Sequence, residues 1–268
     1  MKTFITGYKG FVGKELVKRG FIPLVCDVTN PEEVDLAISK QRPDLLIHLA
    51  SRSDIDFCED IKNHDTVVNV NVKGVRNVFE SLERNRLPGV FVSSDHIWRG
   101  GFFEKHAEDS KLTPSVNFYG STKLVAEQIV KIKGGKIIRT SYLFNAERLA
   151  KRVQCIKAGL KQDYPVFIKR SFLHVLDFCD ALENYCNHFH KLPQTLHLAG
   201  SASVSWYRFM KEVERQYGGK NSVTPRFFEK QGCAPRSHFG GLDVTKALEL
   251  GFTKKDYIDG IKRMIYEG

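Results

Sequence analysis

Tyr119 and Lys123 have types and a spacing that could support proton transfer. They stand four residues apart in a segment with helical periodicity, so their side chains share one face of that helix. An ammonium group close to a phenol stabilises the phenolate, and we therefore expect Lys123 to lower the pKa of Tyr119. Such a tyrosine can donate a proton to a carbonyl oxygen, or accept one from an alcohol, near neutral pH.

A serine doublet, Ser93 and Ser94, ends the apolar segment that precedes this helix. The Ser94 hydroxyl could hydrogen-bond the same carbonyl oxygen that Tyr119 protonates. A tyrosine–lysine pair at this spacing is common, but its combination with a strand-end serine is a more specific signal. We therefore predict catalytic roles for Ser94, Tyr119 and Lys123.

A glycine-rich turn near the N-terminus follows the pattern G-x-x-G-x-x-G, with Gly7, Gly10 and Gly13. It lies between the first predicted strand and the first predicted helix. In such a turn one glycine permits the sharp bend, one lets the backbone approach a pyrophosphate, and one allows the helix to pack closely. The helix N-terminus then offers N–H groups to the phosphates. Packing alone could also require these glycines, but the strand–turn–helix context favours a dinucleotide site.

Short apolar segments and amphipathic helices alternate along the chain and must position these residues. The predicted strands are 2–6, 22–26, 45–49, 90–93, 136–140 and 195–198. The predicted helices are 11–19, 31–41, 66–85, 116–131, 146–160, 177–188, 205–217 and 254–267. Apolar strands separated by helices indicate an α/β fold, a Rossmann-type doubly wound parallel sheet. Ligands bind such sheets at the carboxyl ends of the strands, where the residues above lie.

The regular alternation of predicted strands and helices ends at about residue 160, after which short mixed elements are separated by glycines. We predict a dinucleotide-binding Rossmann core at 1–160. Residues 161–268 would form mainly a small C-terminal substrate-binding lobe, with some elements returning to the core.

Composition narrows the function classes. The net charge of +10 could suit nucleic acid, but the cations are spread along the chain, which favours an anion-binding cleft. No window resembles a membrane span or a signal peptide, so we expect a cytoplasmic protein that binds neither membrane nor nucleic acid. The six cysteines form no C-x-x-C pair and should be reduced thiols. The spacing of His188 and His190 does not predict a metal site.

At these residues the sequence resembles the extended short-chain dehydrogenase/reductase superfamily, and within it the dTDP-4-dehydrorhamnose reductase group of nucleotide-sugar reductases. The resemblance spans nearly the whole chain. It is carried by the glycine turn and by the stretches 26–32, 42–44, 48–51, 69–71, 93–95, 119–123, 139–142, 197–200 and 235–246.

The resemblance implies an NAD(P)H-dependent reductase of a 4-keto sugar attached to a nucleoside diphosphate. Ser94 would be the catalytic hydroxyl, Tyr119 the proton donor, and Lys123 its partner and a ligand of the nicotinamide ribose. The positions implied for the cofactor are Gly7, Tyr8, Lys9, Gly10, Phe11, Val12, Gly13, Asp27, Val28, Leu49, Ala50, Ser51, Arg52 and Asn71, with Tyr119 and Lys123. The positions implied for the substrate are Ser94, Asp95, His96, Tyr142, Arg170 and Arg236.

The chain departs from the group between Gly13 and Asp27, where a longer helix and an additional strand are usual. We place Asp27 at the adenine rather than at the ribose hydroxyls, which leaves the choice between NAD(H) and NADP(H) open. The cations Lys9, Lys14 and Arg19 could meet a 2′-phosphate and favour NADP(H).

Other functions within the superfamily stay open. The dehydratases carry Asp-Glu after the hydroxyl, whereas this chain has Asp95-His96, which argues against water elimination. The stretch around Arg170 resembles the epimerases, in which the arginine can reach a nucleoside diphosphate. A non-catalytic, cofactor-binding regulatory subunit is a further alternative. As in many relatives, the helices at 66–85 and 116–131 could form a homodimer interface.

Overall fold

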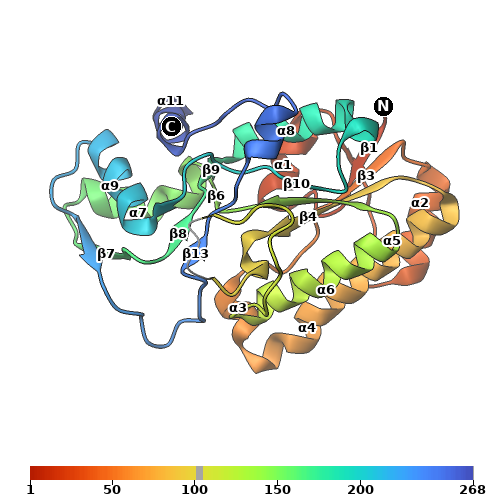
Figure 1. The fold of residues 1–268 in the computed structure, drawn as a ribbon, viewed down its shortest axis with the longest axis horizontal. Helices are drawn as coiled ribbons and strands as arrows, with labels where there is room; N and C mark the ends of the chain where they lie inside the picture. Colours follow the sequence, from red (N-terminus) through yellow and green to blue (C-terminus); the bar gives the residue numbers. More distant parts are fainter. Residues whose placement is uncertain (101–104, 268) are drawn as a thin grey trace.

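The structure is a computed structural model that describes residues 1–100 and 105–267. A six-stranded sheet forms its centre, in the order β10-β5-β4-β3-β1-β2, and every pairing within it is parallel (Figure 1). The strands are β1 Thr3–Ile5, β2 Ile22–Pro23, β3 Leu45–His48, β4 Gly89–Ser94, β5 Lys136–Thr140 and β10 Thr195–His197. The chain reverses its direction of travel across the sheet between β1 and β3, which is the position where such sheets bind ligands.

Helices cover both faces of this sheet. One face packs on α1 (Phe11–Lys18) and α8 (Val175–Asn187). The other packs on α2 (Pro31–Gln41), α5 (Gly74–Asn85) and α6 (Phe118–Ile132), which lie side by side. Side chains alternate along the strands, so Leu45 and Ile47 enter the first hydrophobic cluster and Leu46 enters the second. This two-sided burial explains why the strands read as continuous apolar segments.

A third hydrophobic cluster lies beside the sheet, at the left of Figure 1. Its helices are α7 (Ala146–Lys157), α9 (Trp206–Gln216) and α11 (Tyr257–Glu267). Short strands join them: β6 (Leu143–Phe144) pairs with β9 (Leu173–His174), and β7 (Gln162–Pro165) pairs with β12 (Val223–Arg226). The strands β11 (Val204–Ser205), β8 (Lys169–Arg170) and β13 (Phe239–Gly240) form a three-stranded sheet. Among the described residues of the predicted lobe, only those of β10 join the main sheet. The boundary at residue 160 stays a prediction.

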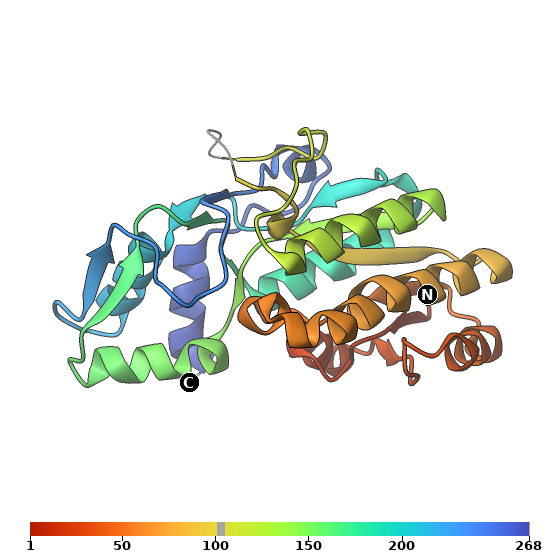
Figure 2. The ribbon, with the colours of Figure 1, turned by 90° about the horizontal axis from the view of Figure 1, so that it is seen from below.

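The remaining elements connect the main ones. They are α3 (Ile55–Glu59), a 3₁₀ turn at Ile61–Asn63, α4 (His64–Val68), a π-helical segment at Asn69–Lys73, a 3₁₀ turn at Asp95–Ile97, a 3₁₀ turn at Phe189–Lys191 and α10 (Thr245–Glu249). Figure 2 shows α4 and α5 continuing one another beside α6.

The predicted Rossmann-type fold is confirmed. All six predicted strands and eight predicted helices are present; the helix at 31–41 and the strand at 136–140 have the predicted bounds, and the ends of the others are shifted. The strand expected at 22–26 has only two residues, because the chain turns away after Pro23, and the helix expected at 66–85 contains the π-helical segment. The strands β6–β9 and β11–β13 were not predicted, because two to four residues are too few to establish a period.

Other expectations concern absences. No helix in the described ranges is long and apolar enough to cross a membrane, and no cluster there of histidine, cysteine and acidic residues could hold a metal ion. All six cysteines, which lie in the described ranges, are free thiols.

A buried ion pair holds α6 to the sheet. Arg139 on β5 donates from Nε and Nη2 to the two carboxylate oxygens of Glu127 on α6, at 2.9 and 2.8 Å. Both side chains are almost fully buried, so neither charge can be solvated if its partner is lost. We expect Glu127→Ala to lower the free energy of unfolding by about 3–5 kcal/mol in urea denaturation.

The matched control is Glu83→Ala, which breaks an exposed pair with Lys133 at the end of the same helix. This change should cost less than about 1 kcal/mol. Equal costs for the two substitutions would contradict the structural role of the buried pair.

Candidate active site

Two cavities meet at the carboxyl ends of the strands. The first, which we call the strand-end cavity, has a volume of about 260 Å³ and lies between the glycine turn, the end of β4 and the start of α6. The second, the lobe cavity, has a volume of about 370 Å³ and extends among β7, β8, α9 and the segment after β12. Four residues line both: Ile55, His96, Tyr142 and Arg170. The two cavities are therefore parts of one continuous site.

The glycine turn forms the floor of the strand-end cavity, and two of its glycines are sterically required. Gly7 has φ +65°, and a Cβ there would lie 2.6 Å from the Ala50 nitrogen. A Cβ on Gly13 would lie 2.3 Å from the Gly7 carbonyl oxygen. Any side chain at either position would push β1, β3 and α1 apart, so the turn needs glycine there.

Gly10 has a different role. A Cβ there would approach only the Gly7 carbonyl oxygen, at 3.1 Å, so the space above Gly10 faces the cavity. Gly10 is the N-cap of α1, and within the described chain no side chain caps this helix and no acidic residue occupies its first turn. The N–H groups of the first turn and the helix dipole thus meet the cavity, as a pyrophosphate requires. These residues fit a dinucleotide.

Thr6 fixes the turn to the end of β3. Its Oγ1 accepts hydrogen bonds from the N–H groups of Leu49 and Ala50, at 3.1 and 3.2 Å. Because both lone pairs of Oγ1 are then used, the hydroxyl can donate its proton to Nδ1 of His48, 3.0 Å away. Thr6 and His48 are fully buried, and burial lowers the pKa of His48 to about 3. Sequence reasoning did not assign this role to either residue.

Asn71 organises the segment after β3. It lies in the π-helical segment, and its Oδ1 accepts from the Arg52 N–H and the Ser51 hydroxyl, at 2.8 and 3.0 Å. Its Nδ2 donates to the Arg52 carbonyl and to Thr122 Oγ1, at 2.9 and 3.1 Å. Asn71 thus ties the predicted cofactor residues Ser51 and Arg52 to the helix that carries Lys123. Irregular helical turns of this kind are frequent at functional sites.

The predicted catalytic residues come together at the end of β4. Ser94, Tyr119 and Lys123 all line the strand-end cavity, and each is less than a tenth exposed. The start of α6 approaches β4 closely because residue 120 is glycine; a Cβ there would lie 2.0 Å from the His96 carbonyl oxygen. Ser94 acts on the Tyr119 hydroxyl in the direction that lowers its pKa.

Lys123 lies between Tyr119 and the sheet. Its Nζ donates to the Val92 carbonyl at 3.1 Å and lies 4.5 Å from the ring centre of Phe91 and 5.9 Å from that of Tyr119. Burial lowers the pKa of the Lys123 ammonium to about 7. Burial raises the pKa of Tyr119, and Ser94 and the charge of Arg148 offset only part of that effect, so the net direction of the shift is opposite to the one we expected from the proximity of Lys123.

Asp95 connects Ser94 to the lobe. Its Oδ1 accepts from Ser94 Oγ at 3.2 Å, and its Oδ2 accepts from Ser141 Oγ at 2.6 Å and faces Arg170 Nε at 3.4 Å. Arg170 also donates from Nη1 to the carbonyls of Lys169 and Ser237, at 2.7 and 2.8 Å. The predicted substrate residues Asp95 and Arg170 are therefore in the site, and they are paired with each other.

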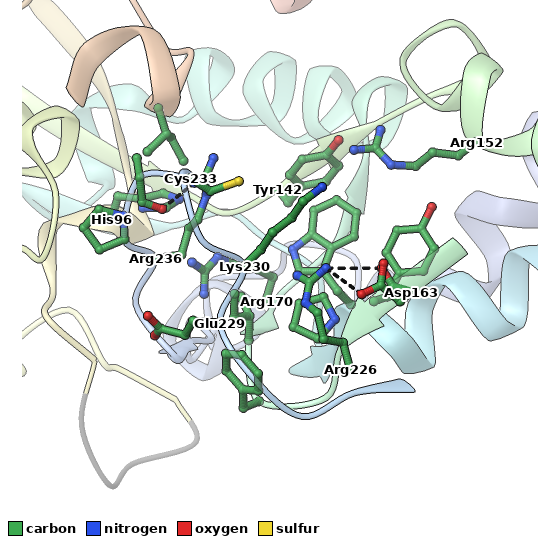
Figure 3. A pocket seen from close by; sticks show the side chains of 18 residues that line it. His96, Tyr142, Arg152, Asp163, Arg170, Arg226, Glu229, Lys230, Cys233 and Arg236 are labelled. Carbon is green, nitrogen blue, oxygen red and sulfur yellow. Dashed lines mark hydrogen bonds and ion pairs between the residues drawn. The ribbon is translucent and has the colours of Figure 1, made fainter. Parts of the chain in front are cut away.

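The lobe cavity is lined by cations and aromatic rings (Figure 3). The cations are Arg152, Arg170, Arg226, Lys230 and Arg236, and the acids are Asp163 and Glu229. His96 and Arg236 lie at one end, and Asp163 and Arg152 lie at the other. The rings of Tyr142 and Trp206 meet edge to face, with centres 4.6 Å apart. A cavity of this charge suits an anionic ligand with an aromatic part.

Some of the residues predicted to bind substrate or cofactor line one of the two cavities, and others do not. Tyr142 and Arg236 line the lobe cavity, and Arg236 forms an ion pair with Asp56 at 2.8 Å. Asp27 and Val28 line neither cavity; the Asp27 carboxylate accepts from the Thr29 N–H and hydroxyl, and their adenine contact stays a prediction.

The other predicted cofactor residues also divide into those that line the strand-end cavity and those that do not. Tyr8, Lys9, Ala50, Arg52 and Asn71 do not line the strand-end cavity. The remaining predicted positions do line it: Gly7, Gly10, Phe11, Val12, Gly13, Leu49 and Ser51.

The suggestion that Arg19 could meet a 2′-phosphate is wrong. Arg19 forms ion pairs with Asp180 and Glu183 on α8, at 2.7 and 3.3 Å, because the end of α1 packs against that helix. Lys9 and Lys14 are exposed near the turn.

Several residues of the site were not predicted. Arg148 lines the strand-end cavity, with its guanidinium 4.9 Å from the ring centres of Phe11 and Tyr142. Arg152 lines the lobe cavity from the next turn of α7, 5.5 Å from the ring centre of Trp206. Their spacing of four residues could have shown that both lie on one helix face. The sequence did not show, however, that this face points into the site.

Comparison with known proteins decides the family. A family model described as the RmlD substrate binding domain matches residues 1–268. This protein belongs to that family. The predicted relation to the extended short-chain dehydrogenase/reductases and to the dTDP-4-dehydrorhamnose reductase group is confirmed.

Two of the three relatives described next match this chain over nearly its full length. The structure is similar to that of a dTDP-4-dehydrorhamnose reductase from Bacillus anthracis in complex with NADP, at 26% identity and a TM-score of 0.89 over all of both chains. The spore coat polysaccharide biosynthesis protein SpsK of Bacillus subtilis is 23% identical over 99% of this chain and 97% of its own length. The dTDP-4-dehydrorhamnose reductase of Burkholderia thailandensis is 30% identical, over 54% of this chain and 51% of its own.

The lowered pKa of Lys123 leads to a stability prediction. With a folded-state value of about 7 and a usual value of 10.5, the unfolded chain binds one more proton between those pH values. This lysine therefore makes stability rise with pH across that window. The melting temperature of Lys123→Met, minus that of the unmodified protein, should be largest near pH 7 and should fall steadily toward pH 10.

Lys151→Met serves as the control, since this lysine is exposed on α7. Its difference in melting temperature should not change over the same range. If the Lys123→Met difference is also flat, Lys123 does not titrate as the buried site requires.

Proposed function

We propose that this protein is an NADP(H)-dependent oxidoreductase that reduces the 4-keto group of a deoxysugar carried on a nucleoside diphosphate. One observation carries the proposal: Ser94, Tyr119 and Lys123 stand where a cavity floored by a phosphate-binding turn opens into a cationic cavity. The family supports the same function, since its relatives include dTDP-4-dehydrorhamnose reductases.

The residues act on the keto oxygen. The hydroxyls of Ser94 and Tyr119 line the same cavity and can both reach one oxygen atom placed at the end of β4. When bound, the reduced nicotinamide supplies the hydride to the keto carbon. The O–H bond of Tyr119 breaks as the O–H bond of the product alcohol forms, which leaves a phenolate.

The protonated Lys123 ammonium offsets the negative charge of that phenolate. A buried cation is most effective where water is excluded, and Lys123 and Tyr119 are both buried. Burial alone raises the pKa of Tyr119, so the phenolate needs this compensation. Lys123 is thus required in its charged form for reduction.

The cofactor and the substrate divide the site between them. The glycine turn would hold the pyrophosphate of the cofactor, and the NADP bound to the Bacillus anthracis relative supports NADP(H). The lobe cavity would hold the nucleoside diphosphate: guanidinium groups suit phosphate oxygens, and the aromatic rings suit a base.

We expect Tyr119→Phe to reduce turnover about 10²- to 10⁴-fold, because it removes the proton donor and keeps the ring. The assay follows NADPH oxidation with a dTDP-4-keto-6-deoxysugar. Tyr217→Phe is the control, because Tyr217 contacts Lys157 outside both cavities. Equal activity of Tyr119→Phe and the unmodified protein would reject the proposed role.

We further propose a homodimer in the cytoplasm. The free thiols fit a reducing compartment. The outer face of α6 exposes Val125 and Ile132, 48% and 78% accessible, and a second copy could cover them. Sedimentation should show a dimer that Val125→Glu with Ile132→Glu converts to a monomer. A monomeric unmodified protein would contradict this assembly.

A further inference from the structure

Arg148 reaches the strand-end cavity from outside the main sheet. It lies in the first turn of α7, a helix of the third hydrophobic cluster, where the Asn145 side chain accepts its backbone N–H at 2.9 Å. Its guanidinium carbon is 4.9 Å from the ring centres of both Phe11 and Tyr142. Guanidinium groups at this distance are attracted to aromatic rings. A cation carried by α7 is therefore held beside the first residue of α1, directly after the glycine turn.

Arg148 differs from the other cations of this cavity in having no acidic partner. The described residues that line the strand-end cavity include three cations, Lys123, Arg148 and Arg170. Lys123 is buried and donates to a backbone carbonyl, and Arg170 is paired with Asp95. In the described ranges of the chain Arg148 forms no ion pair, and its side chain is exposed. Its charge is thus available to a bound anion.

The glycine turn alone does not balance the charge of a pyrophosphate. This group carries about two negative charges near neutral pH, and a helix N-terminus offers about half a positive one. Lys9 and Lys14 are exposed near the turn, but neither lines the strand-end cavity. Gly10 and Phe11 line it together with Arg148. A phosphate bound at the start of α1 therefore meets a full counter-charge in Arg148.

We infer that Arg148 is a cofactor-binding residue, which binds the pyrophosphate from α7 while the glycine turn binds it from α1. The inference rests on the proposed function, in which the glycine turn holds that pyrophosphate. A guanidinium can donate two parallel N–H bonds to phosphate oxygens. The rings of Phe11 and Tyr142 hold it in place before the ligand arrives, which lowers the entropy cost of binding. The cofactor thus ties α7 to the main sheet.

Arg152 shows where the cofactor ends and the substrate begins along the same helix. It lies one turn after Arg148, and it lines the lobe cavity and not the strand-end cavity (Figure 3). For Arg148 the assignment is the reverse. The helix therefore offers one arginine to each ligand: Arg148 to the cofactor, and Arg152 to the nucleoside diphosphate of the substrate.

Two ligands and two truncations separate these roles. The ligands are dTDP and 2′-phospho-ADP-ribose, which is NADP without its nicotinamide, and calorimetric titration gives their dissociation constants. Arg148→Met should weaken 2′-phospho-ADP-ribose about 10- to 100-fold and dTDP less than about 3-fold, because the lost charge-assisted hydrogen bonds are to the cofactor alone. Arg152→Met should weaken dTDP more than 2′-phospho-ADP-ribose.

Two further variants control for charge and for folding. Arg148→Lys keeps the charge but loses the paired N–H groups, so it should recover part of the affinity for 2′-phospho-ADP-ribose. Lys151→Met removes an exposed cation between the two arginines that lines neither cavity, and it should change neither dissociation constant. Melting temperatures close to that of the unmodified protein confirm that each variant is folded.

The outcomes divide clearly. An unchanged affinity of Arg148→Met for 2′-phospho-ADP-ribose, or an equal or larger loss for dTDP, would overturn the inference. It would also be overturned if the unmodified protein did not bind 2′-phospho-ADP-ribose. If this ligand binds and shows the expected loss while the protein reduces no sugar nucleotide, the proposed function fails and the role of Arg148 stands.

Discussion

The Asp95 carboxylate holds the site together. It joins the end of β4 through Ser94, the end of β5 through Ser141, and the lobe through Arg170 on β8. Ser94, Asp95 and Arg170 are buried and Ser141 is half-buried, so each depends on the others to stay hydrogen-bonded or charge-paired. Gly240 lets Arg170 reach this position, since a Cβ there would lie 2.5 Å from its Nη1. Ser94 is thus placed by the same carboxylate that fixes the lobe over the strand ends.

The rest of the site is built by close backbone approach. Gly7 and Gly13 bring the first turn against β3 and α1, and Gly120 brings α6 against the end of β4. Polar side chains then fix each junction from inside: Thr6 between β1 and β3, and Asn71 between the segment after β3 and α6. The reacting groups can therefore be buried and still precisely oriented, which a water-excluding site needs.

Much of this could be predicted from the sequence, because the main sheet and its helices are long enough to show their periods and the reacting residues stand at strand ends. Interactions between residues that lie far apart in the sequence could not be predicted. The spacing of Tyr119 and Lys123 shows that they share a helix face, but not how deeply both are buried, and so the direction of the Tyr119 pKa was wrong. Likewise, Arg19 looked available for a phosphate until its partners on α8, more than 150 residues away, were known.

The central claim is that this site delivers a hydride to a sugar carbonyl and a proton to its oxygen. The most direct measurement uses NADPH deuterated at the transferable position together with a dTDP-4-keto-6-deoxysugar, and locates the label by NMR. The account predicts one deuterium on carbon 4 of a reduced sugar, with one NADPH consumed for each product. An epimerised sugar without net cofactor consumption, or cofactor binding without any label transfer, would contradict it.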